Sequence, residues 1–170
     1  MTFPELIKEW ETFYLMVGTA AATLIGLLFV AVSIHIENFH RKTSTDLHYF
    51  AALIFNCFFY VLLMAILFLV PRLSLLELGI PLLLLSGLGI ANMLIQKTRV
   101  KKIQAKRQNR QIANRFNVPI ACLVGLLIVS IGTMFQITLS LYGVILVIIL
   151  LLASASQNEW ALLVRIEDKK

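Results

Sequence analysis

The sequence predicts an all-α, polytopic membrane protein, in which one domain over residues 1–170 forms a bundle of five transmembrane helices. Hydrophobic residues make up 59% of the chain and charged residues 14%, whereas a soluble domain carries about 25% charged residues. The mean hydropathy is +0.88. Several apolar runs reach about 18 residues, the length at which a helix crosses the hydrocarbon core of a bilayer. Strict alternation of apolar and polar residues is absent, which argues against a transmembrane barrel.

The first predicted span covers residues 13–34 and contains no charged residue. Gly18, Ala22 and Gly26 follow one another at intervals of four, so they lie along one face of a helix. Such a stripe of small residues allows a second helix to approach closely. We therefore expect these three residues to pack against another helix and the first span to be the packing centre of the bundle.

Four further spans follow, and a short amphipathic segment precedes the first one. Residues 1–12 resemble an interfacial helix because Trp10 suits the headgroup zone of a membrane. Pro71 ends the second span, and Pro81 lies inside the third. The second to fifth spans are expected at residues 47–70, 73–95, 118–137 and 139–155.

The distribution of basic residues predicts the orientation in the membrane. With five spans, residues 35–46, 96–117 and the tail 156–170 share one side, and they hold all the lysines and arginines except Lys8 and Arg72. Since basic residues concentrate in cytoplasmic segments, the N-terminus is expected outside and the C-terminus inside. Residues 96–117 lack Gly and Pro, which predicts that the third and fourth spans extend into the cytoplasm as a basic helical hairpin.

The cytoplasmic hairpin is the most basic part of the chain and contains no acidic residue. Its positive charges are expected to contact the phosphates of anionic lipids in the inner leaflet, to which the hairpin is tethered. Nucleic acid, the alternative phosphate partner, is disfavoured for the same reason. The predicted anionic-lipid-binding residues are Lys97, Arg99, Lys101, Lys102, Lys106, Arg107, Arg110 and Arg115.

Four polar residues inside or beside the spans are candidates for pore lining or for polar packing. Asn56 is the polar group nearest the middle of a span, where an amide either bonds across helices or lines a pore. Glu77 is the one acidic residue inside an apolar run, close to its outer end, and it serves either a function or interface anchoring. Thr19 and Thr23 run beside the small-residue stripe of the first span.

A histidine cluster where the first span leaves the membrane offers a candidate metal site. His35, Glu37 and His40 could supply two imidazoles and a carboxylate to zinc or a similar ion. However, His35 and His40 are five residues apart, which separates them around a helix and differs from the four-residue spacing of zinc hydrolases. The alternative is a set of polar interfacial residues, and no other cofactor is expected.

The sequence GTAAATLIGLLFVAVSI at residues 18–34 resembles the first helix of small uncharacterised bacterial multi-span membrane proteins. This resemblance implies a multi-pass protein of the bacterial cytoplasmic (inner) membrane and implies no activity. An enzyme is not expected, because the sequence has no phosphate-binding glycine loop, no Ser/His/Asp set and no extramembrane segment long enough for a catalytic domain.

Three functions remain as hypotheses. The first is a homo-oligomeric ion channel or pore, since nearly the whole chain lies in the membrane and carries stripes suited to close packing. The second is a non-enzymatic adaptor or regulator that binds another membrane protein through the same stripes. The third is a metal-dependent membrane enzyme that uses the histidine cluster.

Overall fold

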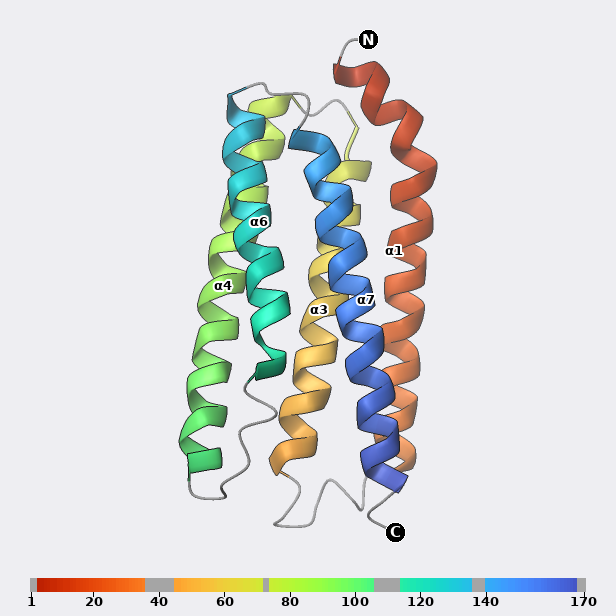
Figure 1. Cartoon of the computed structure of the whole chain (residues 1–170). Coiled ribbons are helices and arrows are strands. Elements are labelled where there is room, and N and C mark those ends of the chain that lie inside the picture. The colour runs from red at the N-terminus through yellow and green to blue at the C-terminus, as the bar shows by residue number, and fades with distance from the viewer. Residues whose placement is uncertain (1–2, 36–44, 72–73, 106–113, 136–139, 168–170) are drawn as a thin grey trace.

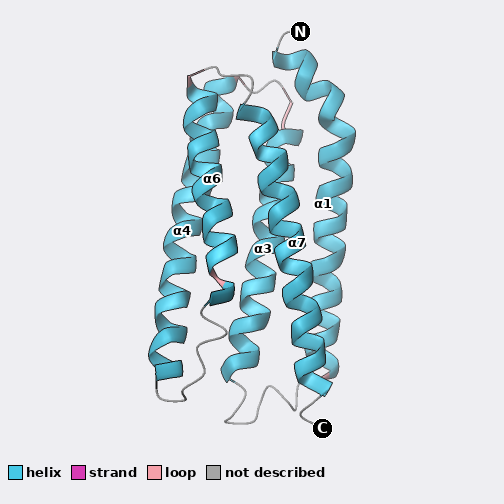
Figure 2. Cartoon of the chain, in the orientation of Figure 1, coloured by secondary structure: helices cyan, strands magenta, loops and turns pink. Residues whose placement is uncertain are grey.

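The protein is a bundle of long helices, as seen in the computed structural model (Figures 1 and 2). The structure describes residues 3–35, 45–71, 74–105, 114–135 and 140–167, and within these ranges it contains helices, turns and bends but no strand. The helices are α1 (Phe3–Ile34), α3 (Thr45–Leu69), α4 (Leu75–Ala105), α6 (Asn117–Met134) and α7 (Ser140–Glu167).

The structure is all-helical in its described part, and each of the five helices is long and apolar enough to cross a membrane, as predicted. The candidate spans are Trp10–Ile34, Leu47–Leu69, Leu76–Lys102, Asn117–Met134 and Ser140–Val164. They agree with the predicted spans in number and order. Residues 3–12 form the first turns of α1 and continue directly into its span. α4 extends to Ala105, beyond the predicted end of the third span.

Consecutive helices run in opposite directions (Figure 1). The ends of α1 at Ile34, α4 at Ala105 and α7 at Glu167 lie at one end of the bundle, together with the first residues of α3 and α6. This is the arrangement in which the basic segments share one side. Which side faces the cytoplasm stays a prediction based on the positive-inside rule.

The centre of the bundle is α3, and the expectation that the first span occupies it is wrong. In α3, 50% of the most apolar window is buried inside the protein, whereas in α1 the fraction is 22%. α3 packs against α1 on one side, α7 on another and α4 on a third, while α6 joins α7 to α4. α1 has its main contact with α3 alone. The rest of the surface of α1 is mostly apolar and exposed, which suits contact with lipid.

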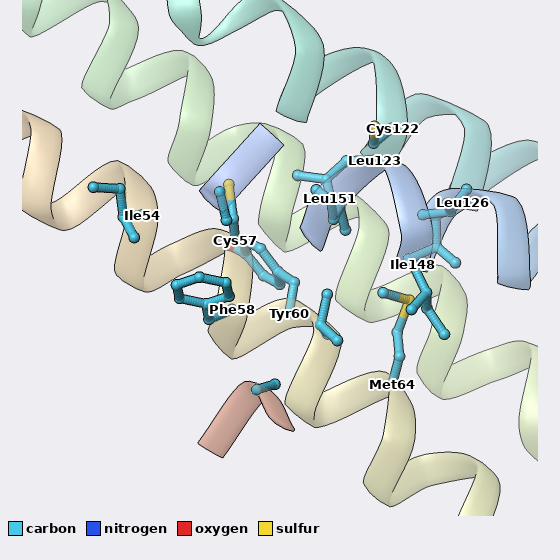
Figure 3. Packing of buried hydrophobic residues seen from close by; sticks show 14 of the residues in the cluster. Ile54, Cys57, Phe58, Tyr60, Met64, Cys122, Leu123, Leu126, Ile148 and Leu151 are labelled. Carbon is cyan, nitrogen blue, oxygen red and sulfur yellow. The ribbon is translucent and has the colours of Figure 1, made fainter. Parts of the chain in front are cut away.

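Large apolar side chains fill the space between α3, α6 and α7 (Figure 3). Phe58 and Met64 of α3 are fully buried, as are Leu123 and Leu126 of α6 and Ile148 of α7. Since burial of apolar side chains gives no hydrophobic advantage over lipid inside a bilayer, this contact is stabilised by close packing.

Among the glycines, Gly79 of α4 and Gly143 of α7 make the closest contacts with a neighbouring helix. A Cβ atom added to Gly143 would lie 2.6 Å from Val129 Cγ2, and one added to Gly79 would lie 2.8 Å from Met134 Cγ. On α1, a Cβ added to Gly18 would lie 3.0 Å from Ala65 Cβ, but one added to Gly26 would meet nothing within 4 Å. Ala22 is exposed as well. Of the predicted packing stripe, only Gly18 packs within the chain.

Candidate functional site

A hydrogen-bonded group of polar side chains lies between α3 and α4. We call it the carboxamide seam and define it by Asn56 and Tyr60 of α3 and Asn92 and Gln96 of α4. On each helix the two residues are four positions apart, so they lie on one face. Because α3 and α4 run in opposite directions, the two faces meet along the seam.

The hydrogen bonds of the seam run from Gln96 to Asn92 on α4 and from there to Asn56 on α3. Asn92 Nδ2 donates to Asn56 Oδ1 and to the Tyr60 hydroxyl oxygen, both at 3.4 Å. Gln96 Nε2 donates to Asn92 Oδ1 at 3.2 Å. Asn56 Nδ2 donates to the Ala52 carbonyl oxygen at 2.7 Å, which turns Asn56 Oδ1 towards α4. The predicted alternative of a bond across helices is therefore observed for Asn56.

The chain of hydrogen bonds ends on an unsatisfied acceptor. Gln96 Oε1 is buried and has no hydrogen-bond partner among the residues that the structure describes. A buried polar atom without a partner costs about 1–3 kcal/mol, so such atoms are uncommon in native proteins.

A glycine makes room for the aromatic member of the seam. A Cβ added to Gly89 would lie 3.2 Å from Tyr60 Cζ and 3.1 Å from Leu123 Cδ1. The hydrogen atom of Gly89 therefore lets α3 and α6 both approach α4 at this level. Tyr60 is buried while its hydroxyl group reaches Asn92.

The carboxamides lie at the outer edge of the bundle. Asn56, Asn92 and Gln96 are each partly exposed, and apolar residues exposed to the surroundings flank them. Leu88 is 70% exposed and Phe59 38%. α3 and α4 also share a less extensive contact than the other main neighbouring pairs. The seam thus lies where the bundle is partly open to its surroundings, although Gln96 Oε1 itself is buried.

Glu77 caps a helix. The Ser74 backbone N–H donates to Glu77 Oε2 at 2.8 Å, and the Glu77 backbone N–H donates to Ser74 Oγ at 3.3 Å. This reciprocal pair is a capping box that satisfies N–H groups at the start of α4. It gives the carboxylate a structural role at the end of the span. Arg72, the nearest basic residue in the sequence, lies outside the described residues.

Thr19 and Thr23 lie on the exposed side of α1, away from the seam. Thr19 Oγ1 donates to the Leu15 carbonyl oxygen at 2.8 Å, and Thr23 Oγ1 donates to the Thr19 carbonyl oxygen at 2.9 Å. Their hydroxyl protons are thus satisfied within α1. Neither threonine needs a polar neighbour.

The predicted lipid-binding residues fall into two groups in the described part of the chain. Arg99, Lys101 and Lys102 of α4 are exposed and free to meet lipid phosphates. The other two donate to neutral amides: Lys97 Nζ bonds Asn117 Oδ1, and Arg115 bonds Asn158 Oδ1 at 2.9 Å.

Arg115 also lies over a ring of α3. Its guanidinium carbon is 5.6 Å from the centroid of Phe50, a distance suited to a cation–π contact. Arg115 therefore ties the start of α6 to α3 and α7. The predicted residues Lys106, Arg107 and Arg110 lie outside the described residues.

The histidine cluster stays a prediction. His35 Nδ1 lies 3.0 Å from the Ala31 carbonyl oxygen, a contact inside its own helix. Glu37 and His40 lie outside the described residues. Among the side chains that are described, no group of three His, Cys, Asp or Glu residues could hold a metal ion.

No protein-family model, curated protein or solved structure matches this chain. The part that sequence reasoning missed is the α4 half of the seam. Asn92 and Gln96 stand four residues apart near the end of an apolar run, which was a detectable signal for a polar stripe.

Proposed function

We propose that the protein is a subunit of a homo-oligomeric membrane pore and that the carboxamide seam lines the pathway between subunits. One observation carries this proposal: a hydrogen-bonded row of carboxamides lies at the outer edge of the bundle, part-way through the membrane. Of the carboxamide atoms, Gln96 Oε1 is buried without a partner in the described part of the chain, which costs about 1–3 kcal/mol. Water in a pore, or another protein surface, removes this cost.

The interior of a single subunit is an unsuitable pathway. Phe58, Met64, Leu126 and Ile148 are fully buried there and fill the space between the helices. A pathway between copies leaves that packing intact. Towards the other end of the bundle the same seam becomes apolar, with Leu85 and Leu88 on α4. Apolar constrictions of this kind gate channels by excluding water.

The orientation and location belong to the same proposal. The polar part of the seam continues along α4 towards the basic end of the bundle, which the positive-inside rule assigns to the cytoplasm. The resemblance of the first span to bacterial proteins favours the bacterial inner membrane, and the exposed basic residues favour contact with anionic lipids there. No catalytic step and no cofactor is part of this function.

A non-enzymatic adaptor is the second candidate, and α1 is the observation that favours it. α1 packs mainly on α3 and leaves Ala22, Thr23 and Gly26 exposed along its outer side. A helix of another membrane protein could approach this surface at backbone level.

Ion flux through liposomes that contain only the purified full-length protein tests the pore. We expect flux from the wild type and severalfold less flux from Asn56→Leu and Asn92→Leu, because leucine makes the seam repel water. Gln157→Leu is the matched control, since Gln157 is an exposed carboxamide of α7. Absence of flux from a folded wild-type protein would contradict the pore and leave the adaptor.

A further inference from the structure

The basic end of the seam indicates what passes along it. Arg99 follows Asn92 by seven residues and Gln96 by three, so all three lie on one face of α4. Arg99 is exposed. At about 1.5 Å of rise per residue it lies roughly one helical turn beyond Gln96, where the seam reaches the end of the bundle.

The charge of Arg99 is uncompensated in the described part of the chain. It forms no ion pair with a residue whose side chain the structure describes. Of the described carboxylates, Glu11 and Glu77 lie near the opposite end of the bundle, and Glu159 belongs to α7, which packs on α3 and α6.

The neighbouring cations are placed differently. Lys97 is held by Asn117 at the contact with α6, and Arg115 is held by Asn158 of α7. Lys101 follows Asn92 by nine residues, which places it on the opposite side of α4. Lys102 follows Arg99 by three residues and continues the same side of α4 one turn further out. Arg99 is therefore the described cation in line with the seam that lies nearest to Gln96, and the other cations add to a positive potential around it.

We propose that the pore conducts anions and that Arg99 is the residue that sets this selectivity. The inference rests on the proposed pore function and names its substrate class as small inorganic anions such as chloride. Basic side chains at the mouth of a pore select anions, because they raise the local concentration of counter-ions and repel cations.

The test is the reversal potential of the full-length protein in planar bilayers with a KCl gradient, at a mean salt concentration of about 0.1 M, where the Debye length is about 10 Å. The reversal potential of the wild type should have the sign expected for chloride permeation. Arg99→Gln should move the reversal potential towards zero, and Arg99→Glu should move it towards the potassium value.

Lys101→Gln is the matched control, since it removes the same charge from the far side of α4. A helix is about 10–12 Å across, so screening should leave selectivity nearly unchanged. Equal effects of Lys101→Gln and Arg99→Gln would overturn the assignment to Arg99. Wild-type current with potassium selectivity would overturn the anion inference and keep the pore. Absence of current from folded protein would remove the pore and this inference with it.

Discussion

α4 meets its two neighbours with different chemistry. Towards α6 it places Gly79 and Gly89 against Thr133 and Leu123, and the two helices pack at close range. Towards α3 it places Asn92 and Gln96 against a looser contact that is partly exposed. Close packing therefore dominates the side of α4 that faces α6, while the side that faces α3 combines the carboxamides with the close approach of Tyr60 to Gly89.

This difference bears on function because a membrane bundle can associate without carboxamides. Packing of small residues is sufficient to hold two helices together in lipid. Hydrogen bonds between side chains in a membrane contribute only about 0.6 kcal/mol on average, so the seam stabilises the subunit weakly. The proposed pore gives these polar groups a role in contact with water or with another copy of the chain.

The largest expected effect is at the close contact between α4 and α6. Gly79→Ile would place atoms against Met134, Thr133 and the Ser130 backbone oxygen, which lies 3.5 Å from an added Cβ. We expect a loss of about 3 kcal/mol in the free energy of unfolding, at the upper end for overpacking. Thermal unfolding in detergent measures it. Gly87→Ile is the control, because an added Cβ there meets nothing within 4 Å.

An intermediate effect is expected on α1, where one glycine packs and another does not. Gly18→Ile should cost about 1–2 kcal/mol, because its side chain meets Ala65 of α3. Gly26→Ile should leave the melting temperature of the monomer unchanged. Size analysis and cross-linking of both variants in detergent separate the outcomes. If Gly26→Ile dissociated the oligomer and kept the monomer folded, the subunit interface would lie on α1 and not at the seam.

The number and order of the spans were predictable because bilayer thickness sets the length of an apolar run, but the candidate spans Leu76–Lys102 and Ser140–Val164 extend beyond the predicted ends at residues 95 and 155. The centre of the bundle was not predictable. A stripe such as Gly18, Ala22 and Gly26 indicates that close contact is feasible, but it does not say which helix makes the contact. An apolar residue that faces lipid and one that faces a neighbouring helix have the same hydropathy, so hydropathy does not distinguish the peripheral α1 from the central α3.

The candidate site was predictable in part for a related reason. Asn56 stood out as a single amide in the middle of a span. Its partner Asn92 depends on the register between α3 and α4, which hydropathy does not report. The role of Glu77 could have been inferred, since Ser74 stands three residues before it and together they form the capping-box pattern at the start of a helix.

The smallest expected effect on stability is at the seam. Its size distinguishes a seam that lines a pore from one that holds α3 to α4. Asn92→Leu removes the bonds to Asn56 and Tyr60, and we expect it to cost about 0.6 kcal/mol and at most about 1.7 kcal/mol. A double-mutant cycle of Asn56→Leu and Asn92→Leu in unfolding measurements isolates the coupling between the two amides.

The prediction is a small coupling in stability together with the loss of flux already expected from Asn92→Leu. A seam that lines a pore needs its polar groups for water and ions, so removing them impairs conduction more than folding. If Asn92→Leu instead destabilised the subunit as much as Gly79→Ile, the carboxamides would be holding α3 to α4. The two sides of α4 would then serve the same structural purpose, and the observation that carries the pore would be lost.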